Sequence, residues 1–231
     1  MAPSGSSGVS VPEDAAAECG LQFFGAVSAS ISHELKNAIA IVNEHAGLLE
    51  DLAALAERGR PVDPKRLKQT AVQIARQVQR ADGIIRNMNR FAHSIDDPVK
   101  TVDLPEMVCF LAALAERKAT MAGVVIDTAC RDASFSIQTR PFFLLNLLWI
   151  CLKTLIEMIS SGAVIQLGAD PNDRGVGVWL RCESLNRSKE TILHAIREQA
   201  GPLLCVLNAE VNIDKASGCI ALSVPKITCD L

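Results

Sequence analysis

The stretch that decides the fold is Ser32-His33-Glu34-Leu35-Lys36-Asn37. Ile31 and Leu35, four residues apart, belong to one face of a helix, because such residues lie one above the other. His33 is two residues from each and therefore points roughly 200° around the helix from either. The sequence thus predicts a solvent-facing histidine on a helix whose opposite face is buried.

An apolar seam extends this helix from Leu21 to about Glu57. Its members follow alternating steps of four and three, the heptad pattern of coiled coils and helical bundles: Ile31, Leu35, Ala38, Val42, His45, Leu49, Leu52 and Ala56. Gly59-Arg60-Pro61 is expected to end the helix.

A second helix is predicted to start at Asp63-Pro64, with aspartate as N-cap and proline in the first turn, and to end before Asp96. Its seam repeats the same steps: Leu67, Ala71, Ile74, Val78, Ala81, Ile85, Met88 and Ala92. A lone antiparallel hairpin cannot bury both seams. Two copies can do so as a four-helix bundle around a two-fold axis, which predicts a homodimer.

The stretch Ser32-His33-Glu34-Leu35-Lys36-Asn37 resembles the phosphoacceptor motif, the H-box, of sensor histidine kinases. Ile39-Ala40-Ile41 and Leu48-Leu49-Glu50-Asp51-Leu52 also fit the family, and the segment 84–91 resembles its second dimerisation helix. The likeness covers about residues 21–95. One departure is Ala38, where the family usually has proline, so a weaker kink is expected there.

The resemblance implies that His33 is the phosphoacceptor, that Glu34 is the general base and that Asn37 supports phosphatase activity. Independently of the family, imidazole is nucleophilic near neutral pH, and Glu34 can hold the proton on its far ring nitrogen. Asn37, four residues on, can position a water, and Lys36 adds positive charge. A receiver domain is expected to dock around His33, on Ser32, Lys36, Ala40 and Glu44.

The rest of the chain predicts a second domain of helices and antiparallel hairpins, with the helices on one face of a sheet. Helices are expected over 103–120, 140–159 and 189–207, and strands over 124–128, 134–137, 163–169, 177–183, 210–214 and 219–224. The predicted domains are therefore a flexible tail (1–19), the helical hairpin (20–97) and this α/β sandwich (98–231), an α+β fold overall.

The order of these elements resembles the ATP-binding domain of histidine kinases, but its motifs are degraded. Asn146 matches the first asparagine of the N-box, whereas Ile150 replaces the Mg²⁺-binding asparagine and offers no oxygen. Asp173-Arg174-Gly175-Val176-Gly177 spells D-x-G-x-G, yet it falls in a predicted hairpin turn. Gly201-Pro202 stands where a glycine-rich lid would be. We therefore expect no nucleotide cofactor and no metal, with Mg²⁺ supplied by the receiver.

Composition narrows the class further. A net charge of -3 argues against a nucleic-acid partner. The apolar run 142–152 is shorter than the roughly 20 residues of a membrane span. Eight cysteines without C-x-x-C spacing, and no visible signal peptide, predict reduced thiols in a cytoplasmic protein.

Three functions follow as hypotheses. The first is a histidine phosphotransfer protein that passes phosphoryl between His33 and a receiver aspartate, charged by an upstream hybrid kinase. The second is an active histidine kinase with a divergent ATP site. The third is a non-catalytic dimeric scaffold or kinase regulator. His45, His93 and His194 are expected to have structural or surface roles.

Overall fold

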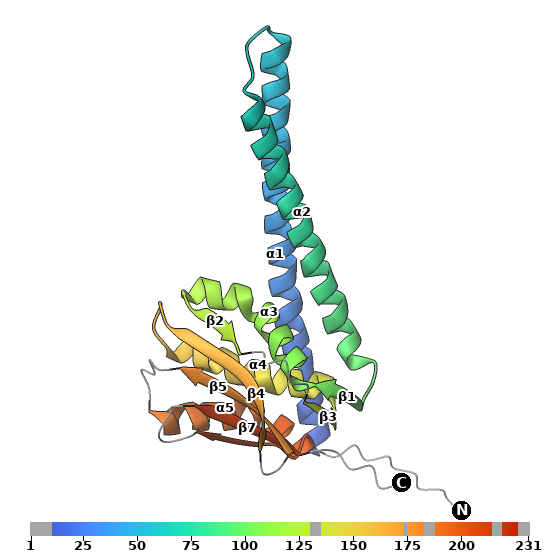
Figure 1. The fold of residues 1–231 in the computed structure, drawn as a ribbon. Coiled ribbons are helices and arrows are strands. Elements are labelled where there is room, and N and C mark those ends of the chain that lie inside the picture. Colours follow the sequence, from blue (N-terminus) through green and yellow to red (C-terminus); the bar gives the residue numbers. More distant parts are fainter. Residues whose placement is uncertain (1–10, 130–134, 173–174, 183–187, 214–218, 226–231) are drawn as a thin grey trace, which may run out of the picture. The chain divides into compact units, whose positions relative to one another are not determined.

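A computed structural model describes residues 11–129, 135–172, 175–182, 188–213 and 219–225. The chain divides into two compact units: Val27–Ala92 forms one, and the residues before Val27 together with those from His93 on form the other. The elements, labelled in Figure 1, are α1 (Val11–Glu57), α2 (Pro64–Ala92), η1 (His93–Ile95), β1 (Lys100–Asp103), α3 (Leu104–Ala122), β2 (Val125–Thr128), β3 (Ser136–Thr139), α4 (Pro141–Met158), β4 (Val164–Asn172), β5 (Gly175–Cys182), α5 (Lys189–Val206), β6 (Glu210–Ile213) and β7 (Ile220–Pro225).

The first unit is the predicted antiparallel hairpin of α1 and α2 (Figure 1). Gly59 follows α1 at a φ of 71°, and its N–H donates to the carbonyl of Ala56, as at many helix ends. The Asp63 carboxylate accepts from the N–H of Lys65, which makes Asp63 the N-cap expected from the sequence. The turn chemistry read from the sequence is therefore confirmed.

Helix α1 begins ten residues earlier than expected. Residues 11–19 were assigned to the flexible tail, yet they are helical and belong with the α/β unit. Ala16, Gly20 and Phe23 are buried at steps of four and three, and the Phe23 ring lies 5.7 Å from that of Trp149. Residues 15–17 are all alanine, the best helix former, which favours a helix at this point.

Within a single chain, the hairpin buries the face of α2 that lies next to the predicted seam. The fully buried residues of α2 are Thr70, Ile84 and Phe91. The predicted seam lies one position further on, and four of its large members are 38–53% exposed: Leu67, Val78, Ile85 and Met88. Because two helices share only one contact face, this seam stays uncovered in a single chain. We call Leu67, Val78, Ile85 and Met88 the α2 stripe.

The second unit is built on a five-stranded sheet of order β2-β4-β5-β7-β6. Strands β2 and β4 are parallel and the other neighbours are antiparallel. Side chains alternate along each strand, so Ile165, Leu167, Leu180 and Leu222 are all fully buried on one face. A separate two-stranded sheet pairs β1 with β3; strand β1 had not been predicted.

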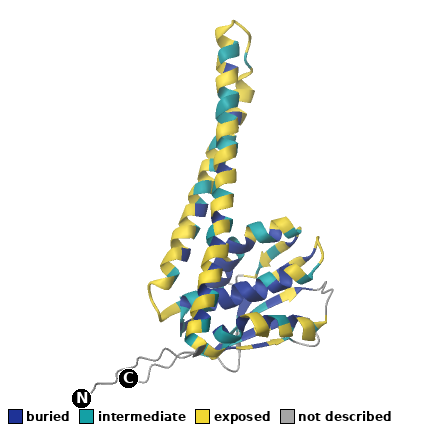
Figure 2. Ribbon diagram, turned by 180° about the vertical axis from the view of Figure 1, so that it is seen from behind, coloured by how far each residue is buried: buried dark blue, intermediate teal, exposed yellow. Residues whose placement is uncertain are grey.

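Helix α4 forms the core of this unit, as the dark ribbon in Figure 2 shows. It is long and apolar enough to cross a membrane by length and composition, but 72% of it is buried inside the unit. Asp103 caps α3 by accepting from the N–H of Glu106, and Ser188 caps α5 by accepting from that of Thr191. The predicted helices of the sandwich are thus confirmed.

One cysteine prediction was wrong. Cys109 is disulfide-bonded. Among the described residues, five cysteines are free thiols: Cys19, Cys151, Cys182, Cys205 and Cys219. Sequence spacing could not reveal the bond, because pairing depends on which segments the fold brings together.

The outer face of the sheet depends on a glycine. A Cβ at Gly168 would overlap the indole of Trp179, the residue paired with it across β4 and β5. The indole Nε1 donates to the Asp170 carboxylate over 2.7 Å, and the Arg181 guanidinium lies 5.3 Å above the ring. Trp179 therefore covers Gly168 on the partly exposed face of the sheet.

We predict that Gly168→Ala lowers the free energy of unfolding by about 1–3 kcal/mol, because the methyl group must displace a fixed ring. Chemical denaturation followed by tryptophan fluorescence measures it. The control is Gly201→Ala in α5, where nothing lies within 4 Å of the added Cβ. It should be neutral or stabilising by up to about 1 kcal/mol. Equal effects of the two variants would contradict the role of Gly168.

Candidate active site

His33 lies on the exposed side of α1. Ile31, two residues before it, is buried, and Leu35, two residues after it, is half-buried. The helical period turns those two inward and His33 outward, as the sequence indicated. A second protein can reach the imidazole without any rearrangement of the hairpin.

The neighbours of His33 form one exposed surface. At about 100° per residue, His33 and five of its neighbours along α1 fall within an arc of roughly 140° around the helix. All five are exposed: Ser32, Lys36, Asn37, Ala40 and Glu44. The structure therefore brings together the predicted docking residues and Asn37 around His33. We call this the His33 surface.

Glu34 lies at the edge of that surface. It is half-buried, whereas His33 and Asn37 are exposed. Its position, about 100° from His33 around the helix, places the carboxylate beside the imidazole and not in front of it. A carboxylate there can orient the ring and leave the other face of the imidazole open to a phosphoryl donor.

Among the described residues of the α/β unit, the side chains at the N-box positions of α4 offer Mg²⁺ no set of oxygen ligands. Asn146 is 1% exposed and its amide nitrogen has no hydrogen-bond partner among the described residues. Ile150, one turn further along α4, is 9% exposed and carries no oxygen. Ile192 and Ile196 of α5, which packs against α4, are fully buried. The residues at the N-box positions are thus core residues, and they do not fit a Mg²⁺–nucleotide complex.

The thiol of Cys151 on α4 is also a core group and not a reactive one. Cys151 is fully buried, and burial raises the pKa of its thiol to about 12. A thiol with so high a pKa is neutral at physiological pH and is not a nucleophile. Helix α4 therefore has a packing role along its length.

The two glycine-containing motifs also lie in regular structure. Gly175 and Gly177 pair with Asn172 and Asp170 across the β4–β5 hairpin, as the sequence predicted. Asp173 and Arg174 lie outside the described residues. Gly201 and Pro202 are inside helix α5 and not in a loop. Neither motif can present a glycine loop to phosphate groups.

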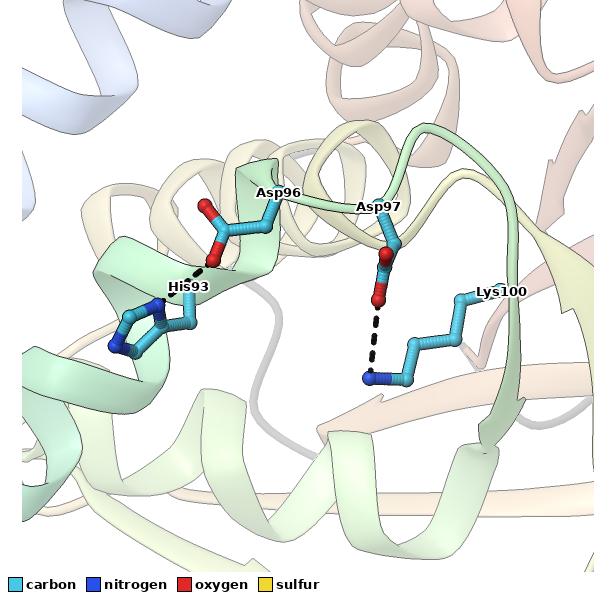
Figure 3. A network of polar contacts seen from close by, with 4 residues as sticks. All are labelled: His93, Asp96, Asp97 and Lys100. Carbon is cyan, nitrogen blue, oxygen red and sulfur yellow. Dashed lines mark hydrogen bonds and ion pairs between the residues drawn. The ribbon is translucent and has the colours of Figure 1, made fainter.

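The other histidines have different surroundings. His45 is half-buried on the α1 seam and His194 is exposed on α5. His93, just after α2, has its Nδ1 2.7 Å from Oδ2 of Asp96, beside the ion pair of Asp97 and Lys100 (Figure 3). His93 thus occupies the predicted helix end with a local carboxylate partner. No group of three His, Cys, Asp or Glu side chains suited to a metal occurs within the described ranges.

The sequence matches no model of a known family and no curated protein. Solved structures similar to this chain include full-length ShkA bound to AMPPNP, at 13% identity, a TM-score of 0.49, and 86% of this chain against 46% of that one. The histidine kinase AdeS of Acinetobacter baumannii is 11% identical at a TM-score of 0.46, covering 85% and 98%. A bacterial phosphotransferase is 14% identical at 0.45, covering 87% and 95%. At such scores the likeness establishes neither family nor function.

We predict that Asn146→Leu raises the free energy of unfolding by about 1 kcal/mol, because it removes a buried amide nitrogen that has no partner among the described residues and fills similar space. Thermal unfolding measures it. The matched variant Ile150→Asn buries a new amide one turn away and should destabilise by about 1–3 kcal/mol. Destabilisation by Asn146→Leu, or nucleotide binding by Ile150→Asn, would contradict the core assignment.

Proposed function

We propose that this chain is a histidine phosphotransfer protein of two-component signalling that acts through His33 as a cytoplasmic homodimer. One observation carries the proposal. The residue that accepts phosphoryl is exposed on a helix, while the positions that would hold Mg²⁺ and nucleotide are buried and include Ile150. Such a protein is a phosphotransferase that does not depend on ATP by itself.

The proposed reaction is a reversible exchange between two side chains. An imidazole nitrogen of His33 attacks the phosphorus of a receiver aspartyl phosphate. An N–P bond forms, the P–O bond to the aspartate breaks, and the aspartate leaves as a carboxylate. The reverse step passes the phosphoryl group to a second receiver. Mg²⁺ enters with the receiver, whose carboxylates supply the oxygen ligands it prefers.

Residues beside His33 have distinct proposed roles. Glu34 holds the proton on the far ring nitrogen and fixes the tautomer of the attacking imidazole. Lys36 places a cation near the transferred phosphoryl group. Asn37, one turn after His33, orients a water that hydrolyses the aspartyl phosphate of a docked receiver. The small Ala40 side chain allows a partner helix to approach closely.

The α2 stripe supports the homodimer. It presents four large apolar side chains in heptad steps along an otherwise polar helix. Exposed apolar residues in such a line are rare on monomers and mark contact surfaces. A second hairpin offers the matching stripe, and two copies around a two-fold axis bury both as a four-helix bundle.

The kinase alternative keeps the same His33 chemistry with ATP as the donor. Its difficulty is physical: at the N-box positions the described structure offers an isoleucine and a buried amide. The scaffold alternative requires only the hairpin surface and no intact H-box. Labelling of the protein in the presence of different donors separates the three functions.

We predict that radiolabel reaches the protein from a phosphorylated receiver domain and not from ATP with Mg²⁺ alone. His33→Gln should reduce labelling to background because it removes the accepting nitrogen. The matched control is His194→Gln, which replaces another exposed histidine and should label like the wild type.

Two results would contradict this proposal in different ways. Labelling of His33 from ATP alone would assign the protein as a kinase. Absence of labelling by every receiver of the same cell, with the fold intact, would favour the scaffold.

We predict that Val78→Glu with Ile85→Glu raises the dimer dissociation constant roughly a hundredfold or more, because each copy would place two charges in an apolar interface. Sedimentation equilibrium measures the constant. Gln79→Glu adds a charge at an exposed position of α2 outside the stripe and should leave the constant unchanged. A wild-type monomer would contradict the homodimer without touching the chemistry of His33.

A further inference from the structure

An open apolar groove lies within the α/β unit, against the first turns of α1. It has a volume of about 700 Å³ and is lined on one side by Ala17, Leu21 and Phe24 of α1 and on the other by Phe142 and Phe143 of α4. Ile95 of η1 also lines it. All these residues belong to one compact unit.

The floor of the groove is fixed by the packing of α1 on α4. Gly20 faces Phe142 so closely that a Cβ there would lie 2.8 Å from the ring. Phe23 is buried, with its ring centroid 5.6 Å from that of Phe142, and the carboxylate of Glu13 pairs with Arg140 at 3.2 Å. These contacts hold α1 in place, so the groove is a preformed feature.

The large apolar side chains along the rim of the groove are exposed to solvent. Leu21 is 76% exposed and Phe24 is 36% exposed, while Ile95 is 50% exposed. Soluble proteins seldom leave neighbouring large apolar side chains in water unless a partner covers them. The groove therefore has both projecting side chains and a hollow beside them.

The polar residues at the rim are already paired. Asp97 forms an ion pair with Lys100 at 3.3 Å, and Arg140 is paired with Glu13. With both charges engaged, the rim offers little to recognise a charged headgroup. The groove thus suits an apolar helix face better than a polar small molecule.

The spacing of these residues identifies the occupant. Ala17, Leu21, Phe24 and Ser28 follow steps of four, three and four, and the next step of three reaches Ile31, where the α1 seam begins. Ile95 follows Ala92 by three residues, which continues the α2 seam in the same way. Both heptad seams of the hairpin therefore extend along the chain to residues that line the groove.

We infer that the groove is filled by the first turns of α1 from a second copy, so that the dimer interface includes the α/β unit as well as the helical bundle. Leu21 and Phe24 of each copy enter the groove of the other, as knobs enter holes in a coiled coil. The same patch serves on both copies, as two-fold symmetry requires. This inference rests on the proposed homodimer.

The test compares dimer dissociation constants of full-length proteins by sedimentation equilibrium. Leu21→Gln with Phe24→Gln removes the knobs while keeping the net charge and the helix propensity. We expect the constant to rise roughly tenfold or more, as for central interface residues. Met121→Gln changes another apolar residue, 75% exposed on α3 and outside the groove, and should have no effect.

The outcomes separate this inference from the proposed function. A constant that stays unchanged in the Leu21/Phe24 variant, while the Val78/Ile85 variant dissociates, overturns the groove contact and leaves the bundle dimer intact. A wild-type monomer overturns the groove contact and the dimer, whereas labelling of His33 is judged separately. Circular dichroism of each variant verifies that the helices are retained, because the replaced side chains are exposed.

Discussion

The burial of α4 on nearly all its sides is the constraint on which the α/β unit depends. A strand-covering helix normally keeps a polar stripe for solvent or for a ligand. Here α4 is packed along almost its whole length, and the one asparagine in its middle is shut inside with its amide nitrogen unsatisfied. A helix packed in this way stabilises the unit, which agrees with the proposal that phosphoryl transfer takes place on the hairpin.

The two long helices each have two apolar faces that lie side by side. On α2, the buried face of Thr70, Ile84 and Phe91 lies beside the α2 stripe. On the first turns of α1, the buried face of Ala16, Gly20 and Phe23 lies beside the exposed face of Ala17, Leu21 and Phe24. A helix with two adjacent apolar faces contacts two neighbours at once. The proposed bundle interface and the proposed groove contact would thus be two parts of the same pattern.

Much of this architecture could be predicted from the sequence. The turn at Gly59, the N-cap at Asp63, the exposed His33 and the hairpin around Gly175 all depend on local rules, and all were confirmed. Periodicity locates the apolar seam of α2 without telling which neighbour covers it, and a single chain buries the face one position before that seam. The helical start at Val11 goes with contacts between distant segments, such as Phe23 with Trp149, which spacing alone does not encode.

The placement of the tryptophans makes the two units optically distinct. The chain has two tryptophans and no tyrosine, and both Trp149 and Trp179 lie in the α/β unit. Trp149 is buried beside Phe23, and Trp179 is held by Asp170 and Arg181. The hairpin therefore contributes helical ellipticity but no indole emission. Loss of the hairpin alone would lower helical ellipticity without changing indole emission, whereas loss of the sandwich would change both signals.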